Sequence, residues 1–188
     1  MSDWKIECLD WARLSKDDAL ALAELASSVW PRKDVQTRFR ELLSCPDATG
    51  CPAGQRPGIF CIRDGRKMIA AAKVFPRRVS TGGLKRVVMA LAGVCSAPDR
   101  RGQGLGKAVV QASLGLVDGG VYQVSLFQTS RKVFPFYEKL GARLVTNRIV
   151  NSLAPDPAAN PFWDEVAMSY PASVPWPEGP IDLLGPGY

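Results

Sequence analysis

The sequence contains no histidine among its 188 residues. Histidine is therefore excluded as a general base. The five cysteines are an odd number scattered over half the chain, and the nearest pair is Cys45 and Cys51 in "CPDATGC". Without histidine or a second close pair, we expect no structural metal site. Dense, even sets of cysteines are typical of secreted disulfide scaffolds, so this set favours a reducing compartment.

Long hydrophobic runs are also missing. Charge-free runs such as Val87–Pro98 fall well short of the roughly 18 apolar residues of a membrane span. The N-terminal "MSDWKIECLD" carries acids and lacks the apolar stretch of a signal peptide. We therefore expect a soluble, cytoplasmic protein that does not contact membranes. Its 46% hydrophobic and 22% charged residues are typical of a globular domain.

An excess of acidic residues is absent, and the formal net charge is +6. The basic pairs are spread along the chain, no expected helix carries a continuous basic stripe, and the common nucleic-acid-binding motifs do not occur. We expect no nucleic acid partner. A modest positive field also attracts a small polyphosphate ligand.

Hydrophobic periodicity and turn residues predict an order of strand, two helices, three strands, helix, strand, helix and two strands. Asp64-Gly65 and "STGG" mark the hairpin turns. The predicted elements are strands Trp4–Leu9, Ile59–Arg63, Met68–Phe75, Lys85–Ala97, Tyr122–Phe127, Leu144–Val150 and Glu165–Tyr170, and helices after Ser15, over Lys33–Leu43, Leu105–Val117 and Lys132–Leu140.

This order predicts a mixed α/β fold with helices flanking one sheet. The sheet is expected to be mostly antiparallel, with one central parallel pair joined by a right-handed crossover. We assign residues 1–170 to one domain. Residues 171–188 hold five prolines and three glycines, which exclude a helix or a central strand. Their apolar side chains are too many for a solvated linker, so we expect a strap packed on the domain. The alternatives are a contact with a second copy in a homodimer and a contact with the acceptor pocket.

The segment "SAPDRRGQGLGKAVV" (Ser96–Val110) joins an apolar strand to a helix through three glycines flanked by basic residues. Free N–H groups and the positive end of the helix dipole at such a turn favour an anion, phosphate above all. The spacing does not fit a Walker A loop, because Ala108 stands where serine or threonine is required. It does not fit the G-x-G-x-x-G dinucleotide fingerprint either.

The turn resembles the pyrophosphate motif Q/R-x-x-G-x-G/A of the acetyl-CoA-dependent N-acetyltransferase superfamily, GNAT, in "RGQGLG". Farther along, "SRKVFPFYEKLGARLV" resembles its second signature, Asn-x-x-Ala-x-x-x-Tyr-x-x-x-Gly-Phe. Tyr137 and Gly141 match that signature. Ser130, Val133 and Ala142 replace the usual asparagine, alanine and aromatic residue.

The resemblance implies that acetyl-CoA is the cosubstrate, with no metal. Its pyrophosphate would lie on the backbone of the glycine turn, and its pantetheine arm would run along the end of the preceding strand, where a backbone N–H could polarise the thioester carbonyl. The cofactor-binding residues implied in this way are Val94, Cys95, Ser96, Arg101, Gly102, Gln103, Gly104, Leu105, Gly106, Lys107 and Ser130.

Tyr137 is the candidate general acid that returns a proton to the departing CoA thiolate. A packed core aromatic is the alternative reading of this residue. The general base is not identified, because the strand Val87–Cys95 has no carboxylate. Asp164 and Glu165 could face the acceptor, but we interpret them as solvated surface charges. Cys95, without a base partner, is interpreted as a small packed residue rather than a nucleophile.

The resemblance therefore predicts an N-acetyltransferase that moves an acetyl group to an amine of a small molecule or peptide, by direct transfer in a ternary complex. The alternative is a non-catalytic acyl-CoA-binding, sensing or interaction module on the same fold. Expected acceptor segments are Lys16–Leu43 and Ser152–Trp163, which do not identify the amine.

Overall fold

A computed structural model of the chain describes residues 4–52 and 54–188. The first three residues of the predicted 1–170 domain, and Ala53 in the predicted loop, lie outside the described residues. The chain forms two compact units. Unit 1 contains the chain up to Phe75 together with Gly93–Gly115, and unit 2 contains Pro76–Ala92 and Leu116–Tyr188.

The sheet of unit 1 is antiparallel and runs in the order β1, β2, β3, β4. Its strands are β1 (Ile6–Asp10), β2 (Gly58–Asp64), β3 (Lys67–Thr81) and β4 (Leu84–Ser96). β3 and β4 are long and continue into unit 2. Five of the seven residues of β2 are buried, which suits a strand covered on both faces.

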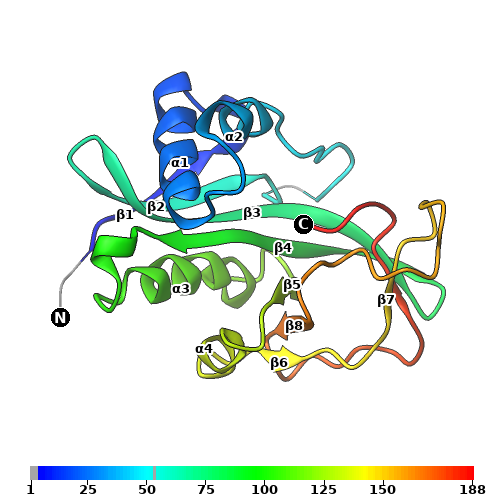
Figure 1. The fold of residues 1–188 in the computed structure, drawn as a ribbon. Coiled ribbons are helices and arrows are strands. Elements are labelled where there is room, and N and C mark those ends of the chain that lie inside the picture. The colour runs from blue at the N-terminus through cyan, green and yellow to red at the C-terminus, as the bar shows by residue number, and fades with distance from the viewer. Residues whose placement is uncertain (1–3, 53) are drawn as a thin grey trace. The chain divides into compact units, whose positions relative to one another are not determined.

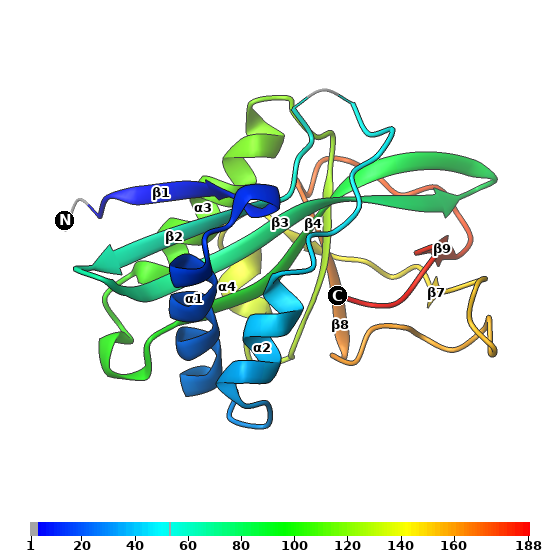
Figure 2. The same cartoon turned by 90° about the horizontal axis from the view of Figure 1, so that it is seen from above.

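Helices cover both faces of this sheet. Figures 1 and 2 show α1 and α2 on one face and α3 on the other. Ser15 caps α1 by accepting from the Asp18 N–H, and Asp34 caps α2 in the same way through Thr37. The helical segments are η1 (Trp11–Arg13), α1 (Lys16–Val29), α2 (Val35–Leu42), η2 (Pro98–Arg100) and α3 (Leu105–Asp118).

In unit 2, β5 pairs in parallel with β4, through Met89 opposite Ser125 and Ala90 opposite Leu126. β8 pairs antiparallel with β5 and β6. The elements are β5 (Ser125–Thr129), α4 (Phe134–Glu138), β6 (Arg143–Leu144), β7 (Ile149–Val150), β8 (Val166–Tyr170) and β9 (Ile181–Asp182). The predicted fold class is confirmed: a mixed α/β fold with a mostly antiparallel sheet and a parallel β4–β5 pair.

Four details differ from the sequence-based expectation. β3 continues past Pro76, which lies beyond Val74, the last residue paired with β2, so the missing N–H breaks no bond of that ladder. The predicted strand 144–150 is two short strands, β6 and β7. α4 is shorter than the predicted helix. The C-terminal segment contributes β9, which bonds to both β3 and β7, the latter in parallel.

The core of unit 2 includes the C-terminal segment. Ile181 and Leu183 are fully buried in a cluster with Val79, Val88 and Leu126. Arg77 Nε donates to Leu183 O at 3.1 Å, and the Tyr188 hydroxyl donates to Leu126 O at 2.9 Å. Residues 171–188 therefore pack on unit 2 through both apolar side chains and backbone hydrogen bonds.

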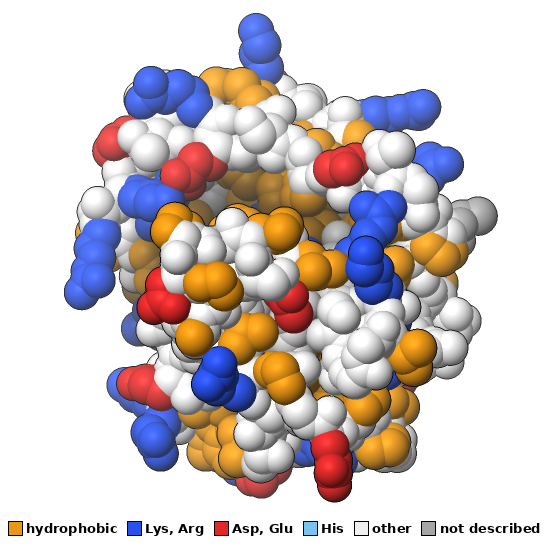
Figure 3. Space-filling model, turned by 90° about the vertical axis from the view of Figure 1, so that its right-hand side faces the viewer, with side chains coloured by type: hydrophobic (Ala, Val, Ile, Leu, Met, Phe, Trp, Pro, Cys, Tyr) orange, Lys and Arg blue, Asp and Glu red, His pale blue; other side chains and the backbone are white. Residues whose placement is uncertain are grey.

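On the face seen in Figure 3, Lys and Arg side chains stand in several separate groups rather than in one stripe. Over residues 4–52 and 54–188, none of the helices combines the length and hydrophobicity that a membrane crossing requires.

Candidate functional site

The glycine turn lies between β4 and α3 in unit 1. β4 ends at Ser96, and Pro98 opens the short helix η2, where its missing N–H costs no strand pairing. The first hydrogen bond of α3 runs from Ala108 N to Gly104 O at 3.0 Å. The N–H groups of residues 105–107 precede this bond and have no acceptor within the helix. The turn therefore presents a row of backbone donors at the positive end of the α3 dipole.

The space beside the three glycines is open. Gly102 and Gly104 both have φ of +79°, a left-handed conformation that favours glycine. A Cβ built on Gly102, Gly104 or Gly106 meets no heavy atom within 4 Å. Gly106 has no positive φ, so neither its conformation nor its neighbours require glycine at this position. The space left by its missing side chain suits a ligand that approaches the backbone closely.

The basic residues around the turn have different partners. Arg100 forms an ion pair with Asp64 at the end of β2, so its charge is partly neutralised by the protein itself. Arg101 and Lys107 are exposed. Of the three cations near the turn, Arg101 and Lys107 are therefore the ones free to meet an anion.

The end of β4 holds Val94, Cys95 and Ser96 beside this turn. Cys95 is buried, and burial raises the pKa of its thiol to about 12. A thiol with this pKa is protonated at neutral pH, and only the thiolate is a strong nucleophile. Cys95 thus has the properties of a small packed residue, as its sequence context predicts.

A lysine that the sequence analysis did not single out lies next to this strand end. The Lys73 side chain, on β3, lies along Gly93 of β4: a Cβ built on Gly93 would be 2.5 Å from Lys73 Cε. The available signal was a single lysine in the apolar strand "MIAAAKVF" (Met68–Phe75). Its neighbours could not be derived from the sequence, because they come from η1, α2 and β4.

Gln103 is exposed in the turn and Leu105 is buried at the start of α3, both in unit 1. Two other predicted residues, Ser130 and Tyr137, belong to unit 2. Ser130 follows the last residue of β5, and Tyr137 is on α4. The Tyr137 ring is buried between aromatic neighbours, with centroids 4.7 Å from Phe127 and 4.9 Å from Phe136. This packing fixes the ring. It is compatible with Tyr137 acting as a general acid and equally with a packed core aromatic.

The two acids considered for the acceptor side follow Trp163. Glu165 is exposed and accepts a hydrogen bond from the Arg131 N–H at 3.3 Å. Asp164 is partly buried, and burial followed by the neighbouring Glu165 raises its pKa. The Asp164 backbone N–H donates to Gln128 at 2.8 Å.

The comparison with known families matches residues 11–145 to the acetyltransferase (GNAT) domain. This match covers well over half of the chain. The chain belongs to the GNAT acetyltransferase family. Members of this family are acyltransferases, and its fold generally binds acetyl-CoA or another acyl-CoA. None of the curated proteins matches the chain.

Solved structures show the same fold. Escherichia coli ElaA superposes with a TM-score of 0.57 at 15% identity, over 88% of this chain and 98% of that one. A Trypanosoma brucei acetyltransferase superposes with a TM-score of 0.53 at 23% identity, over 77% of this chain and 96% of that one. A GCN5-related N-acetyltransferase from Kribbella flavida superposes with a TM-score of 0.56 at 17% identity, over 75% of this chain. This chain spans about a third (33%) of the length of the Kribbella protein.

In this GNAT chain, the glycine turn fits the pyrophosphate of an acyl-CoA. Phosphate groups accept hydrogen bonds from backbone N–H groups that no side chain obstructs. The turn combines such N–H groups with open space and exposed cations. Among residues 4–52 and 54–188, no three or more Cys, Asp or Glu side chains gather to hold a metal ion.

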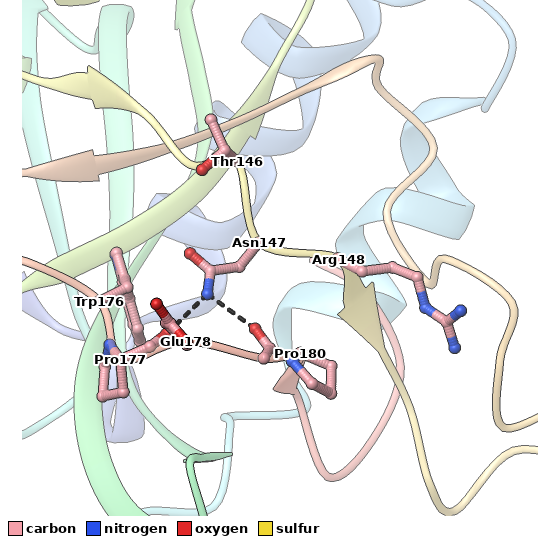
Figure 4. Close-up of a pocket in the computed structure, with 8 residues that line it drawn as sticks. Thr146, Asn147, Arg148, Trp176, Pro177, Glu178 and Pro180 are labelled. Carbon is pink, nitrogen blue, oxygen red and sulfur yellow. Dashed lines mark hydrogen bonds between the residues drawn. The ribbon is translucent and has the colours of Figure 1, made fainter.

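A hollow lies in each unit of this GNAT chain, and the one in unit 1 borders the predicted acceptor segment Lys16–Leu43 and the stretch between Ser96 and Arg101. A pocket of about 700 Å³ in unit 2 lies between the Thr146–Arg148 and Trp176–Pro180 segments. Figure 4 shows Asn147 pointing across it, with its amide donating to Pro177 O and Gly179 O, while Arg148 points away. A cleft of about 460 Å³ in unit 1 is bordered by α1, the start of β3 and η2. Neither contains a residue that the sequence assigned to the cofactor.

Proposed function

We propose that this chain transfers an acetyl group from acetyl-CoA to an amine of a small molecule or peptide, directly and within a ternary complex. The observation that carries the proposal is the turn before α3, where three glycines leave open space beside a row of free N–H groups. In this proposal the turn binds the pyrophosphate, Val94–Ser96 bind the pantetheine arm, and Tyr137 donates to the departing sulfur.

The first experiment is a calorimetric titration of the purified protein with acetyl-CoA, with propionyl-CoA as the comparison. A panel of amino acids, dipeptides, polyamines and arylalkylamines is then incubated with acetyl-CoA, and released CoA thiol and acetylated products are measured. Micromolar binding followed by acetylation of any amine supports the proposal. Binding without transfer to any amine favours the acyl-CoA-binding module. A folded protein that binds neither thioester contradicts both.

Replacing Tyr137 by Phe is expected to lower kcat about tenfold and to change the Kd of acetyl-CoA less than twofold. The effect lies below the usual 10²–10⁴ of acid–base catalysis, because a thiol with a pKa near 8.5 departs as thiolate more easily than an alkoxide. Phe keeps the ring contacts with Phe127 and Phe136. Steady-state kinetics and calorimetry measure the two effects separately.

Tyr170→Phe is the matched control. The Tyr170 hydroxyl donates to Asp118 at 2.6 Å on the surface of unit 2, so its removal is expected to leave kcat unchanged. An unchanged kcat in Tyr137→Phe would exclude the hydroxyl from the chemistry. Parallel losses of binding and turnover would show that Tyr137 serves packing alone.

A further inference from the structure

Lys73 occupies an unusual place for a lysine. Its neighbours on β3, Ala72 and Val74, are 0% and 1% exposed, and its side chain reaches across to the backbone of β4. A Cβ at Gly93 would lie 2.5 Å from Lys73 Cε and 3.3 Å from Nζ, and Gly93 has φ of +57°. Only glycine satisfies both constraints. β4 thus leaves room for the lysine side chain at the residue before Val94.

The amine of Lys73 has an aromatic ring beside it but no ion-pair partner among the described residues. Nζ lies 5.3 Å from the centre of the Trp11 ring in η1. The carboxylate that interacts with it, Glu41 of α2, forms its ion pair with Lys33 instead, at 2.6 Å. The Lys73 ammonium is therefore not held by an acid.

The surroundings favour the neutral amine. Burial is the largest influence and lowers the pKa of Lys73; the cations Arg38 and Lys33 lower it further. Cys95 and Glu41 act in the opposite direction. Cys95, on β4, keeps its own proton at neutral pH because burial raises the pKa of its thiol to about 12. At neutral pH these groups therefore shift Lys73 toward the form that accepts a proton.

This location matters because the chain lacks the usual bases. It has no histidine, and β4 has no Asp or Glu. Lys73 adjoins the start of Val94–Ser96, the segment expected to hold the acyl arm. It also faces Trp11 and α2, and α2 lies within the predicted acceptor segment Lys16–Leu43. An amine acceptor that reaches the thioester from this side meets Lys73.

We propose that Lys73 is the general base that deprotonates the acceptor ammonium, an inference that rests on the proposed acetyl transfer. The Lys73 amine takes one proton from the acceptor R–NH₃⁺. The freed amine forms the C–N bond with the acetyl carbonyl and the C–S bond breaks. The sulfur leaves as CoA thiol with the proton of Tyr137, and the second amine proton restores the Tyr137 hydroxyl. The Lys73 ammonium then returns its proton to solvent.

In this cycle Trp11 stabilises the protonated Lys73 that forms when the acceptor loses its proton. The negative face of an indole ring attracts an ammonium, which stabilises the protonated Lys73 without trapping it as an ion pair with a carboxylate would. Lys73 as a whole residue keeps some exposed surface, although its amine lies in desolvating surroundings. The acceptors expected from this arrangement are amines that are charged at neutral pH.

The first test measures Lys73 in the unmodified protein and needs no acceptor. Competitive labelling with acetic anhydride across pH, followed by mass spectrometry of peptides, reports the pKa of each lysine amine. Lys73 is expected to become reactive at lower pH than Lys67, which is exposed at the start of the same strand. Labelling of both residues with the same pH dependence overturns the proposal.

The second test uses variants that keep the side-chain length. Lys73→Met and Lys73→Arg are expected to lower kcat/KM at pH 7 about 30-fold, with the loss shrinking to under threefold near pH 9.5 where the acceptor loses its own proton. The acceptor is the panel amine that the parent acetylates fastest, and Lys67→Met is the control variant. Calorimetry checks that acetyl-CoA still binds.

The outcomes separate the base role from its rivals. Rescue by Lys73→Arg shows that a positive charge is needed, and overturns the base role. An acetyl group found on Lys73 after incubation with acetyl-CoA alone makes it an acceptor, and also overturns it. A parent protein that acetylates no amine at any pH contradicts the proposed function. Transfer with an unchanged pH profile in Lys73→Met contradicts only the base assignment.

Discussion

Replacing Gly106 by Asp is expected to weaken acetyl-CoA binding about 100-fold, or about 2.7 kcal/mol, while the protein remains folded. The new carboxylate would stand at the first turn of α3, where the pyrophosphate is expected to lie. Two like charges about 4 Å apart repel by about 4 kcal/mol at a protein surface. Isothermal titration calorimetry of parent and variant measures the loss directly.

The structure makes Gly106 a sharper test than its neighbours in the turn. Gly102 and Gly104 have φ of +79°, where any side chain strains the backbone, so a loss of binding there could come from a distorted turn. Gly106 has an ordinary helical position and open space for a Cβ. An acidic residue in the first turn of a helix also stabilises it through the dipole. The variant is therefore expected to be at least as stable as the parent.

Gln111→Glu is the matched control for charge. Gln111 is exposed on α3, more than one turn beyond Gly106, and the substitution makes the same change in formal charge without altering the turn. Its Kd for acetyl-CoA is expected to stay within twofold of the parent. Equal losses in both variants would assign the effect to the overall charge. Unchanged binding in Gly106→Asp would remove the turn from the cofactor site.

The sequence predicts the parts of this fold that depend on local signals. The cap at Ser15, the hairpin turn at Asp64-Gly65 and the strand, turn and helix around Gly102–Gly106 each follow from neighbouring residues, and each is present. The family resemblance also comes from contiguous motifs. Short-range patterns therefore predict both the fold class and the position of the glycine turn.

Features that depend on distant partners could not be derived in this way. A proline is expected to end a strand by local rules. β3 nevertheless continues through Pro76, because its pairing with β2 stops at Val74 and the missing N–H breaks no bond there. Ile181 and Asp182 form a strand in a proline-rich segment because β3 and β7 supply partners. Lys73 becomes noteworthy only when Gly93 and Trp11 are placed around it. In each case tertiary contacts override or complete the local preference.

The C-terminal segment gives the second large expected effect. Leu183→Ala is expected to lower the free energy of unfolding by about 3 kcal/mol, within the 2–5 kcal/mol usual for a buried leucine. Leu183 is 0% exposed in the core of unit 2, next to Phe162 and Leu126. Its backbone N–H donates to Val150 O at 2.9 Å, which holds the position in place and limits collapse of the cavity. Urea denaturation followed by circular dichroism measures the change.

Leu153→Ala makes the same chemical change at a leucine that is 71% exposed, so we expect a change within about 0.5 kcal/mol of the parent. The difference between the two variants isolates the burial of Leu183 from the effect of alanine on the unfolded chain. A loss below about 1 kcal/mol in Leu183→Ala would show that the segment is held weakly. The expected loss instead makes residues 171–188 part of the folding unit, because a cavity is costly only where its walls are fixed.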